Sequence, residues 1–195
     1  MRTMNKTICV FSSSSDDIPK HFFDCARDLA HRITEKKYAM LYGGGNVGLM
    51  GEMALTVQKN KGRLIGVIPQ LLHDKGYSFP QASEMIVTAD MRERKTVMEQ
   101  RSDAFITMPG GFGTLEEFAE LATLKQLKYH SKPIILLNWH GYYDPIIRFF
   151  HQLFEQRFAP HSQEHIYRVV SDPESALLEI EREWEREPFH KSQPI

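Results

Sequence analysis

Three loops of small residues in this 195-residue chain could hold an anion. They are Ser12–Ser15, Gly43–Gly48 and Pro109–Thr114, and each directly follows a short apolar segment. Glycines let a backbone turn tightly and bring its N–H groups close to an anion, and the start of a helix adds a partial positive charge. One such loop is usually only a turn, but three at one edge of a sheet indicate a phosphorylated ligand.

Charged residues follow the third loop and also open another predicted helix. Glu116 and Glu117 come directly after Thr114, where acidic groups favour the helix dipole, and Thr114 and Glu117 have the spacing of a capping box. The segment Asp90–Lys95 instead puts three cations in a first helical turn, a placement that the dipole opposes. A nearby anion explains them best, either a ligand phosphate or a carboxylate such as Glu117.

Other kinds of site are disfavoured by the same residues. The loop Gly43–Gly48 has the glycine spacing of a dinucleotide-binding loop, but the next apolar segment, Leu64–Pro69, is followed by Gln70 and supplies no carboxylate for a ribose. The chain has no Gly-Lys-Ser/Thr sequence, which excludes a P-loop ATPase. His161 and His165 have no third ligand nearby in the sequence, so we expect no metal site.

Short apolar segments alternate with helical patterns along the chain. They are rich in Ile, Val, Leu and Phe, as is typical of strands buried on both faces of a parallel sheet. We predict an α/β fold, a single doubly wound, Rossmann-like parallel sheet with helices on both faces, formed by residues 1–195 as one nucleotide-binding domain. Ligands bind beyond the carboxyl ends of such strands, where the three loops lie. The expected strands are Thr7–Phe11, Tyr38–Tyr42, Leu64–Pro69, Glu84–Thr88, Ala104–Met108, Pro133–Asn138 and Ile166–Val170.

Helical spacing is clearest in two segments. Ile18–Lys36 has its apolar residues on one face, whereas Thr114–Leu127 has only a narrow polar face and is expected to be largely covered. The aromatic residues between Tyr142 and Phe158 are expected in the core or at a subunit interface. The irregular stretch His73–Ala82 could be a flexible edge or lid, and a charged C-terminal helix is expected at about residues 172–187, followed by a frayed tail at 188–195.

Composition limits the partners and the location. The formal net charge of −1 argues against a broad nucleic-acid-binding surface, and no apolar run approaches the roughly 18 residues that would indicate a membrane span. Cys9 and Cys25 form no paired framework, so the chain is expected to be reduced and cytoplasmic.

Taken together, the motifs resemble the LONELY GUY family, the cytokinin riboside 5′-monophosphate phosphoribohydrolases, which were long mislabelled as lysine decarboxylases. The segment Pro109–Glu117 is similar to the PGGxGTxxE signature of that family. The resemblance covers roughly residues 7 to 170 and extends to Leu41–Gly45, Gly48–Gly51, Gly66–Pro69, Asp90–Met91, Glu93–Lys95, Asn138 and Gly141–Tyr143.

The resemblance implies hydrolysis of the N-glycosidic bond of an N6-modified AMP, which releases the free base and ribose 5-phosphate without a cofactor. It also implies a homodimer, with Arg94 and Glu117 as the essential catalytic pair. The nucleotide site implied in this way is lined by Lys95, Gly110, Gly111, Phe112, Gly113, Thr114, Leu115, Glu116 and Thr123. Ser13, Gly44 and Gly45, from the other two loops, complete the predicted site.

Two positions depart from the family pattern. Ser12–Ser15 stands where the family usually has Cys-Gly-Ser-Ser, and Gly76 stands where plant members carry a glutamate. We expect the phosphate chemistry to survive both changes, while the preferred base stays open. The sequence also leaves Arg94 two roles, holding Glu117 ionised or contacting the phosphate.

Two other functions stand beside this one. A nucleotide-binding module without turnover is the first, and the presence of both Arg94 and Glu117 speaks against it. A PLP-dependent lysine decarboxylase is the second, and no segment singles out its Schiff-base lysine and a partner for the pyridinium nitrogen.

Overall fold

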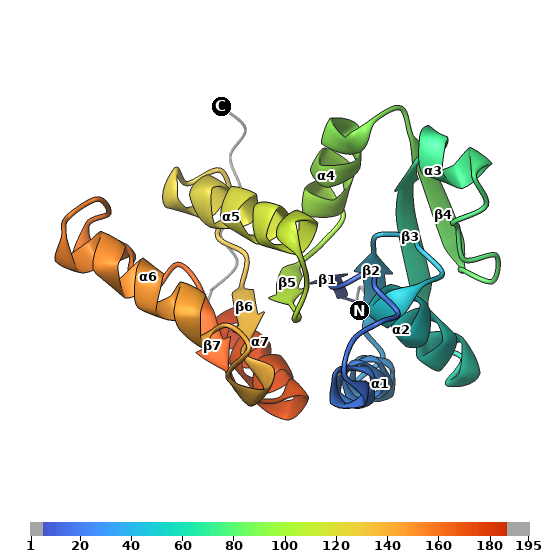
Figure 1. Ribbon diagram of the computed structural model, residues 1–195, viewed down its shortest axis with the longest axis horizontal. Coiled ribbons are helices and arrows are strands. Elements are labelled where there is room, and N and C mark those ends of the chain that lie inside the picture. Colours follow the sequence, from blue (N-terminus) through green and yellow to red (C-terminus); the bar gives the residue numbers. More distant parts are fainter. Residues whose placement is uncertain (1–5, 187–195) are drawn as a thin grey trace.

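The computed structural model describes residues 6–186, which form one parallel seven-stranded sheet flanked by helices (Figure 1). The strand order is β4-β3-β2-β1-β5-β6-β7. The strands are β1 (Thr7–Phe11), β2 (Ala39–Tyr42), β3 (Leu64–Pro69), β4 (Glu84–Thr88), β5 (Ala104–Thr107), β6 (Ile134–Leu137) and β7 (Arg168–Val170). The predicted doubly wound sheet is therefore confirmed, and each expected strand lies within two residues of its predicted limits.

The described part of the chain has seven α-helices, of which α7 follows the last strand and the others lie between strands. They are α1 (Lys20–Glu35), α2 (Gly48–Lys59), α3 (Gln70–Asp74), α4 (Met91–Gln100), α5 (Phe112–Gln126), α6 (Asp144–Glu155) and α7 (Pro173–Arg186). The predicted C-terminal helix is α7, while the predicted frayed tail at 188–195 lies outside the described residues. Among residues 6–186, no helix combines the length and the apolar character needed to span a membrane.

The two faces of the sheet carry separate cores. Helices α1, α2 and α7 pack on one face, where Ile8, Val10 and Met40 are fully buried or nearly so. Helices α4, α5 and α6 cover the other face above Cys9 and Phe105. The central strands are buried on both sides for this reason, which explains their continuous apolar sequences.

Helix α5 is less covered than its sequence suggests. Only Thr114, Phe118 and Leu121 are buried, while Ala119 and Leu127 are exposed. The helix packs one face on the sheet, Leu115, Ala122 and Leu124 are only partly buried, and Ala119 lies in an open groove beside α6. The expectation that α5 would be largely covered is wrong for the single chain.

The strand order reverses between β1 and β5. From β1 the chain proceeds outward through β2, β3 and β4, and it then returns to β5 on the other side of β1. Phe11 at the end of β1 pairs with Thr107 at the end of β5, so the loops after these two strands diverge from neighbouring points. A crevice opens at such a switch point, and ligands of doubly wound sheets bind there.

Candidate active site

A cavity of about 580 Å³ opens beyond the carboxyl ends of the central strands. All three predicted loops contribute to it, through Ser12–Ser15, through Gly43 and Gly45, and through Gly111–Thr114. Its volume is in the range of small-molecule sites. The Oγ atom of Ser12 is buried at its wall and has no hydrogen-bond partner among the described residues, so a ligand could supply one.

An ion pair between α4 and α5 forms part of the cavity wall. Arg94 Nη1 donates to Glu117 Oε1 at 2.7 Å, and the two side chains are only 9% and 11% exposed. Arg94 Nε also donates to the carbonyl of Val67 at 3.0 Å, which fixes the guanidinium against the end of β3. A charged pair so nearly dehydrated is costly unless its hydrogen bonds are made, and a functional site is a common reason to retain one.

Burial raises the pKa of the Glu117 carboxyl above its usual value, and Arg94 opposes this rise by its charge and hydrogen bond. Glu117 is thus a carboxylate in a largely dehydrated wall, hydrogen-bonded to Arg94, and the charge of Lys95 also lowers its pKa. Of the two roles that the sequence left for Arg94, the structure shows the contact with Glu117.

The spacing of Thr114 and Glu117 does not make a capping box. Helix α5 begins at Phe112, two residues before the predicted start, so that Gly111 is its N-cap and no side chain forms a capping hydrogen bond. The carboxylate of Glu117 points to Arg94 instead. The capping interpretation of Glu117 is therefore wrong, and the N-terminus of α5 is left without a side-chain acceptor.

The open N-terminus of α5 is suited to an anion. The first backbone hydrogen bond of the helix is donated by Leu115 to Gly111, so the N–H groups of Phe112, Gly113 and Thr114 precede it. A Cβ atom added at Gly111 or Gly113 would meet no atom within 4 Å. Packing within the described chain gives no reason for glycine at either position, whereas the approach of a ligand to the backbone does.

The glycine loop before α2 is not free in the same way. The side chain of Asp16 accepts from the Gly48 N–H at 2.7 Å, and the Ser13 carbonyl accepts from the Leu49 N–H at 3.0 Å. The loop after β1 thus occupies the N-terminus of α2. Of the glycine loops, only the one before α5 presents an uncapped helix N-terminus to the cavity.

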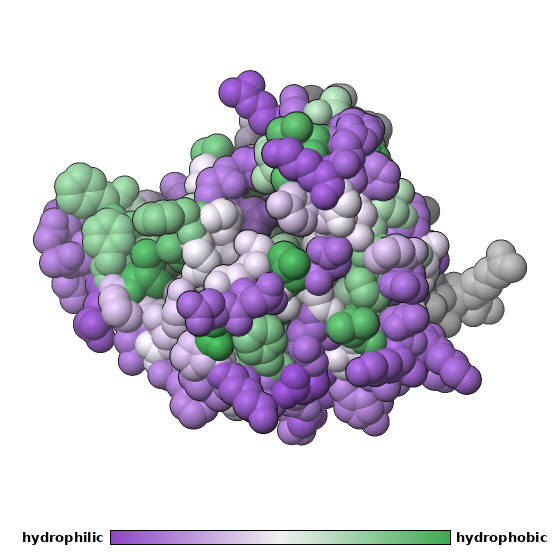
Figure 2. Space-filling model, turned by 45° about the vertical axis from the view of Figure 1, so that its right-hand side comes forward, coloured by the Kyte–Doolittle hydropathy of each residue, from purple (hydrophilic) through white to green (hydrophobic). Residues whose placement is uncertain are grey.

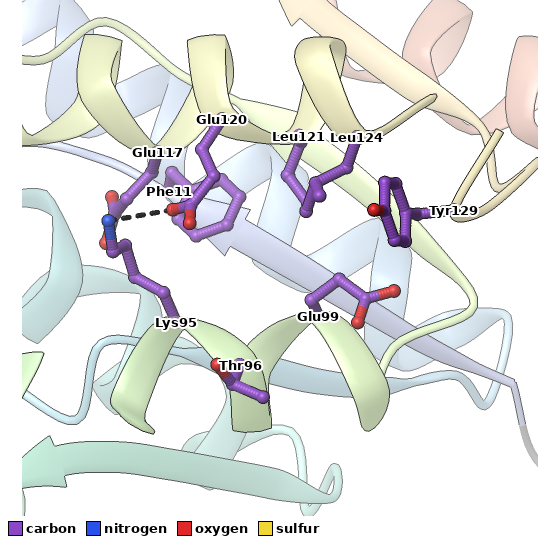
Figure 3. A pocket seen from close by; sticks show the side chains of 9 residues that line it. All are labelled: Phe11, Lys95, Thr96, Glu99, Glu117, Glu120, Leu121, Leu124 and Tyr129. Atoms are coloured by element: carbon purple, nitrogen blue, oxygen red, sulfur yellow. Dashed lines mark ion pairs between the residues drawn. The ribbon is translucent and has the colours of Figure 1, made fainter. Parts of the chain in front are cut away.

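Lys95 lies on the other side of the ion pair. Its ammonium pairs with Glu116 and with Glu120, the latter at 2.8 Å, and it lines a second pocket of about 290 Å³ between α4 and α5. Figure 3 shows Lys95 reaching from α4 toward Glu120 on α5, close to Glu117. Glu117 borders both pockets, so the pair Arg94–Glu117 stands between them.

Several residues of the predicted site lie away from the main cavity. Gly110 and Leu115 line a shallow pocket against α6, and Thr123 faces the groove between α5 and α6. Gly44 lies behind the cavity wall, packed against Ile68. The cavity thus includes Ser13, Gly45, Gly111–Thr114, Arg94 and Glu117, but not these four residues, Lys95 or Glu116.

Part of the cavity lining is apolar and was not anticipated. This part consists of Met50, Ile68, Leu72, Tyr77 and Met91. Tyr77 belongs to the stretch interpreted as a flexible edge or lid, and its carbonyl accepts from the Asn46 N–H at 3.0 Å. The stretch is therefore tied to the glycine loop. The only sequence signal that this stretch borders the cavity was the aromatic side chain of Tyr77 in an otherwise irregular segment.

No three His, Cys, Asp or Glu side chains within residues 6–186 lie close enough together to hold a metal ion. The charged groups at the cavity are the guanidinium of Arg94 and the carboxylate of Glu117. The arrangement can bind an anion at the start of α5, stabilise positive charge at Glu117 and contact an apolar group through the apolar part of its lining.

Comparison with known proteins shows the family of the chain. Residues 50–180 match a family model described as "Possible lysine decarboxylase". The chain is 43% identical over 186 residues to LOG6 of Arabidopsis thaliana, named a probable cytokinin riboside 5′-monophosphate phosphoribohydrolase, and the match covers 95% of this chain and 91% of that protein. The chain belongs to the family of cytokinin riboside 5′-monophosphate phosphoribohydrolases. The phosphoribohydrolase LOG5 of Arabidopsis thaliana is 41% identical over 173 residues, which cover 89% of this chain and 75% of that protein. The predicted LONELY GUY resemblance is thereby confirmed.

Solved structures of more distant proteins share the fold. The molybdenum cofactor binding protein of Rippkaea orientalis has a TM-score of 0.71 at 24% identity, covering 92% of this chain and 98% of its own. The molybdenum cofactor carrier protein of Chlamydomonas reinhardtii has a TM-score of 0.70 at 20% identity, covering 93% and 99%. At this identity the likeness extends to the fold alone. The family membership rests on the phosphoribohydrolases.

Proposed function

We propose that this protein hydrolyses the N-glycosidic bond of a nucleoside 5′-monophosphate, with an N6-modified AMP as the substrate class, to free base and ribose 5-phosphate. One observation carries the proposal. The buried pair of Arg94 and Glu117 lines the same cavity as the uncapped N-terminus of α5. A phosphate group and a developing cation could therefore be held at the two ends of one ribose.

The 5′-phosphate would bind at the N-terminus of α5. The N–H groups that precede the first helical hydrogen bond, together with the helix dipole, favour a dianion there. Gly111 and Gly113 leave the space that this approach requires. The site accounts for a preference for nucleotides over nucleosides, because a riboside would leave these N–H groups without an acceptor.

The ribose would then lie against Glu117. As the C1′–N9 bond breaks, positive charge develops on the ribose ring, and a carboxylate stabilises it. Water supplies the oxygen that bonds to C1′, and the departing base takes a proton. Glu117 would act through the ribose hydroxyls or by orienting this water, while Arg94 keeps it ionised and in place.

The base would lie against the apolar part of the cavity lining. Met50, Leu72 and Tyr77 lie there with side chains suited to an apolar substituent on the base. An N6-alkyl group would remove their surface from water, whereas an unmodified adenine would bury less of it. We therefore place N6-alkylated AMP above AMP as a substrate.

The rival functions find less support at this site. A PLP-dependent decarboxylase needs a lysine at the cofactor, yet the residues that line the cavity include none. Lys95, the lysine nearest to the pair in sequence, is engaged by Glu116 and Glu120. A binding module without turnover would have no use for a buried carboxylate beside the ribose.

We also propose that two copies associate through the face formed by α5 and α6. A groove between these helices is lined by Phe118, Ala119, Leu153 and other mainly apolar residues, and Phe149 beside it is 53% exposed. Figure 2 shows hydrophobic side chains gathered on the side that carries α6. Apolar surface of this kind on a folded chain marks an interaction site. The resemblance, which implies a homodimer, supports a second copy as the occupant.

A cytoplasmic location, with neither nucleic acid nor membrane as a partner, completes the proposal. Both cysteines are free and buried, and burial raises the pKa of Cys25 to about 12, so its thiol stays protonated. The near-neutral formal charge of −1 gives no broad attraction to polyanions.

The direct test is product analysis with three substrates, N6-isopentenyl-AMP, AMP and the unphosphorylated N6-isopentenyl riboside. We expect free base from both monophosphates, faster from the alkylated one, and little from the riboside. Tight AMP binding without release of base from any substrate would instead favour the binding module. Release from the riboside at the same rate as from its monophosphate would contradict the phosphate site at α5.

A further inference from the structure

Two adjacent tyrosines between β6 and α6 reach the loop that follows β5. Tyr143 Oη donates to the carbonyl of Met108 at 2.7 Å, and Tyr142 Oη donates to the carbonyl of Gly110 at 2.8 Å. The two carbonyls flank Pro109, so the hydroxyl groups hold both sides of one short turn. Burial raises the pKa of Tyr143, which keeps its hydroxyl protonated as a donor.

The tyrosines are themselves held by the sheet. The side chain of Asn138, directly after β6, accepts from the Tyr143 N–H at 2.7 Å and donates to Asp144 at 2.7 Å. Asp144 is the first residue of α6. The edge of the sheet, the start of α6 and both tyrosines thus form one hydrogen-bonded unit that ends at the Gly110 carbonyl.

The geometry of a trans peptide gives this unit a consequence at the cavity. The C=O and N–H groups of one peptide unit point in opposite directions. Gly110 and Tyr142 both line the shallow pocket against α6, whereas Gly111 lines the main cavity. When the Gly110 carbonyl is directed to Tyr142, the N–H of Gly111 in the same peptide unit is turned away from α6, toward the cavity.

We propose that Tyr142 is a positioning residue for the substrate phosphate, which it serves by fixing the peptide unit between Gly110 and Gly111. The inference rests on the proposed function, since it assigns the N–H of Gly111 to the 5′-phosphate. Tyr143 anchors the preceding carbonyl and keeps the end of β5 in register with the loop. Neither tyrosine is among the residues that line the main cavity.

The alternative is that Tyr142 serves only the stability of the fold. Tyr142 is 43% exposed, and its ring makes an edge contact with Phe22 that a phenylalanine would keep. Removing the hydroxyl therefore leaves the packing in place and frees the Gly110–Gly111 peptide unit. If Tyr142 were purely structural, removing its hydroxyl would lower the stability of the fold without changing how the protein distinguishes a phosphate from a hydroxyl.

The test compares Tyr142→Phe with Tyr38→Phe. Tyr38 also donates one hydrogen bond through its hydroxyl, at 2.8 Å to Glu181, far from the cavity. Two quantities are measured: the ratio of kcat/KM for N6-isopentenyl-AMP to that for its riboside, and the dissociation constant of AMP in the Glu117→Gln background, where turnover is slow. A thermal unfolding curve establishes that each variant is folded.

We expect Tyr142→Phe to lower the phosphate-to-riboside ratio and weaken AMP binding by about 3- to 10-fold, the range of one hydrogen bond, through KM rather than kcat. Tyr38→Phe should change neither quantity. Equal values for the two variants, or an equal loss with monophosphate and riboside, would overturn the proposal. If the parent protein binds AMP without turnover, the proposed function fails, while the binding comparison still decides the role of Tyr142. If it binds no AMP, both proposals fail.

Discussion

The guanidinium of Arg94 lies against the backbone of Gly43, so close that a Cβ atom on residue 43 would overlap Nη2. The glycine loop after β2 therefore does more than turn the chain. It leaves the space in which Arg94 reaches Glu117, and it connects the second predicted loop to the ion pair at the cavity.

Gly43→Ala should consequently abolish most activity by displacing Arg94. We expect kcat to fall by about 10²-fold, the typical loss for a preorganised electrostatic partner, and the free energy of unfolding to fall by about 1–3 kcal/mol from overpacking. Steady-state kinetics and denaturant unfolding measure the two effects. Unchanged kcat would mean that the position of Arg94 does not matter.

Gly113→Ala should have the opposite effect on the fold. Its Cβ atom meets nothing within 4 Å, and alanine is the better helix residue by roughly 0.5–1 kcal/mol, so stability should be unchanged or higher. The methyl group would stand where the phosphate approaches, and KM for a monophosphate should rise by about 10-fold, equivalent to roughly 1.4 kcal/mol. A variant that is destabilised, or that binds AMP normally, would contradict the assigned site.

The pH dependence should report on Glu117. Since the carboxylate is the active form and burial raises its pKa, activity should rise with pH through a midpoint above the ordinary value of 4.5. Arg94→Met removes the main group that opposes this rise in the pKa of Glu117, so the midpoint of the variant's residual activity should move to still higher pH. A midpoint at or below 4.5 in the parent protein would contradict the buried state of this carboxyl.

The raised pKa of Glu117 also makes the free energy of unfolding depend on pH in a defined direction. A carboxyl whose pKa is raised by folding favours the folded state at low pH, and this contribution is lost as pH rises through the folded pKa. Glu117→Gln cannot ionise, so the free energy of unfolding should fall less between pH 4 and 8 in this variant than in the parent protein. Urea titrations at both pH values provide the measurement, with Glu116→Gln as the control.

A separate prediction concerns the proposed dimer interface at the face formed by α5 and α6. Ala119 is exposed in the single chain and lies in the groove between these helices. The parent protein should elute at twice the 22.6 kDa of one chain, and Ala119→Glu should shift it to the monomer without unfolding it. Leu55→Glu, at an exposed apolar position on α2, should leave the dimer intact. A monomeric parent would refute the interface.

The sequence predicted the strands well because each is a continuous apolar segment bounded by loop residues, and a two-sided core demands that pattern. It could not decide the role of Glu117, because the same position satisfies both the spacing of a capping box and a contact with Arg94 across two helices. Only the start of α5 at Phe112 resolves this.

Other features depend on contacts between distant segments. The N-terminus of α2 has a glycine loop similar to that of α5, yet Asp16 occupies it from another loop. The hydroxyl of Tyr142 reaches Gly110 across 32 positions of the chain. Neither contact leaves a periodic or spaced pattern in the sequence, and the apolar part of the cavity lining, which includes Tyr77, is likewise assembled from separate elements.

The most direct test of the central claim compares Glu117→Gln with Glu116→Gln. The two residues are neighbours on α5, but only Glu117 lines the cavity and pairs with Arg94. Single-turnover release of base from N6-isopentenyl-AMP should slow by about 10²- to 10³-fold in Glu117→Gln and stay near the parent rate in Glu116→Gln, with AMP binding retained in both. Near-normal turnover in Glu117→Gln would show that this carboxylate does not stabilise the breaking bond.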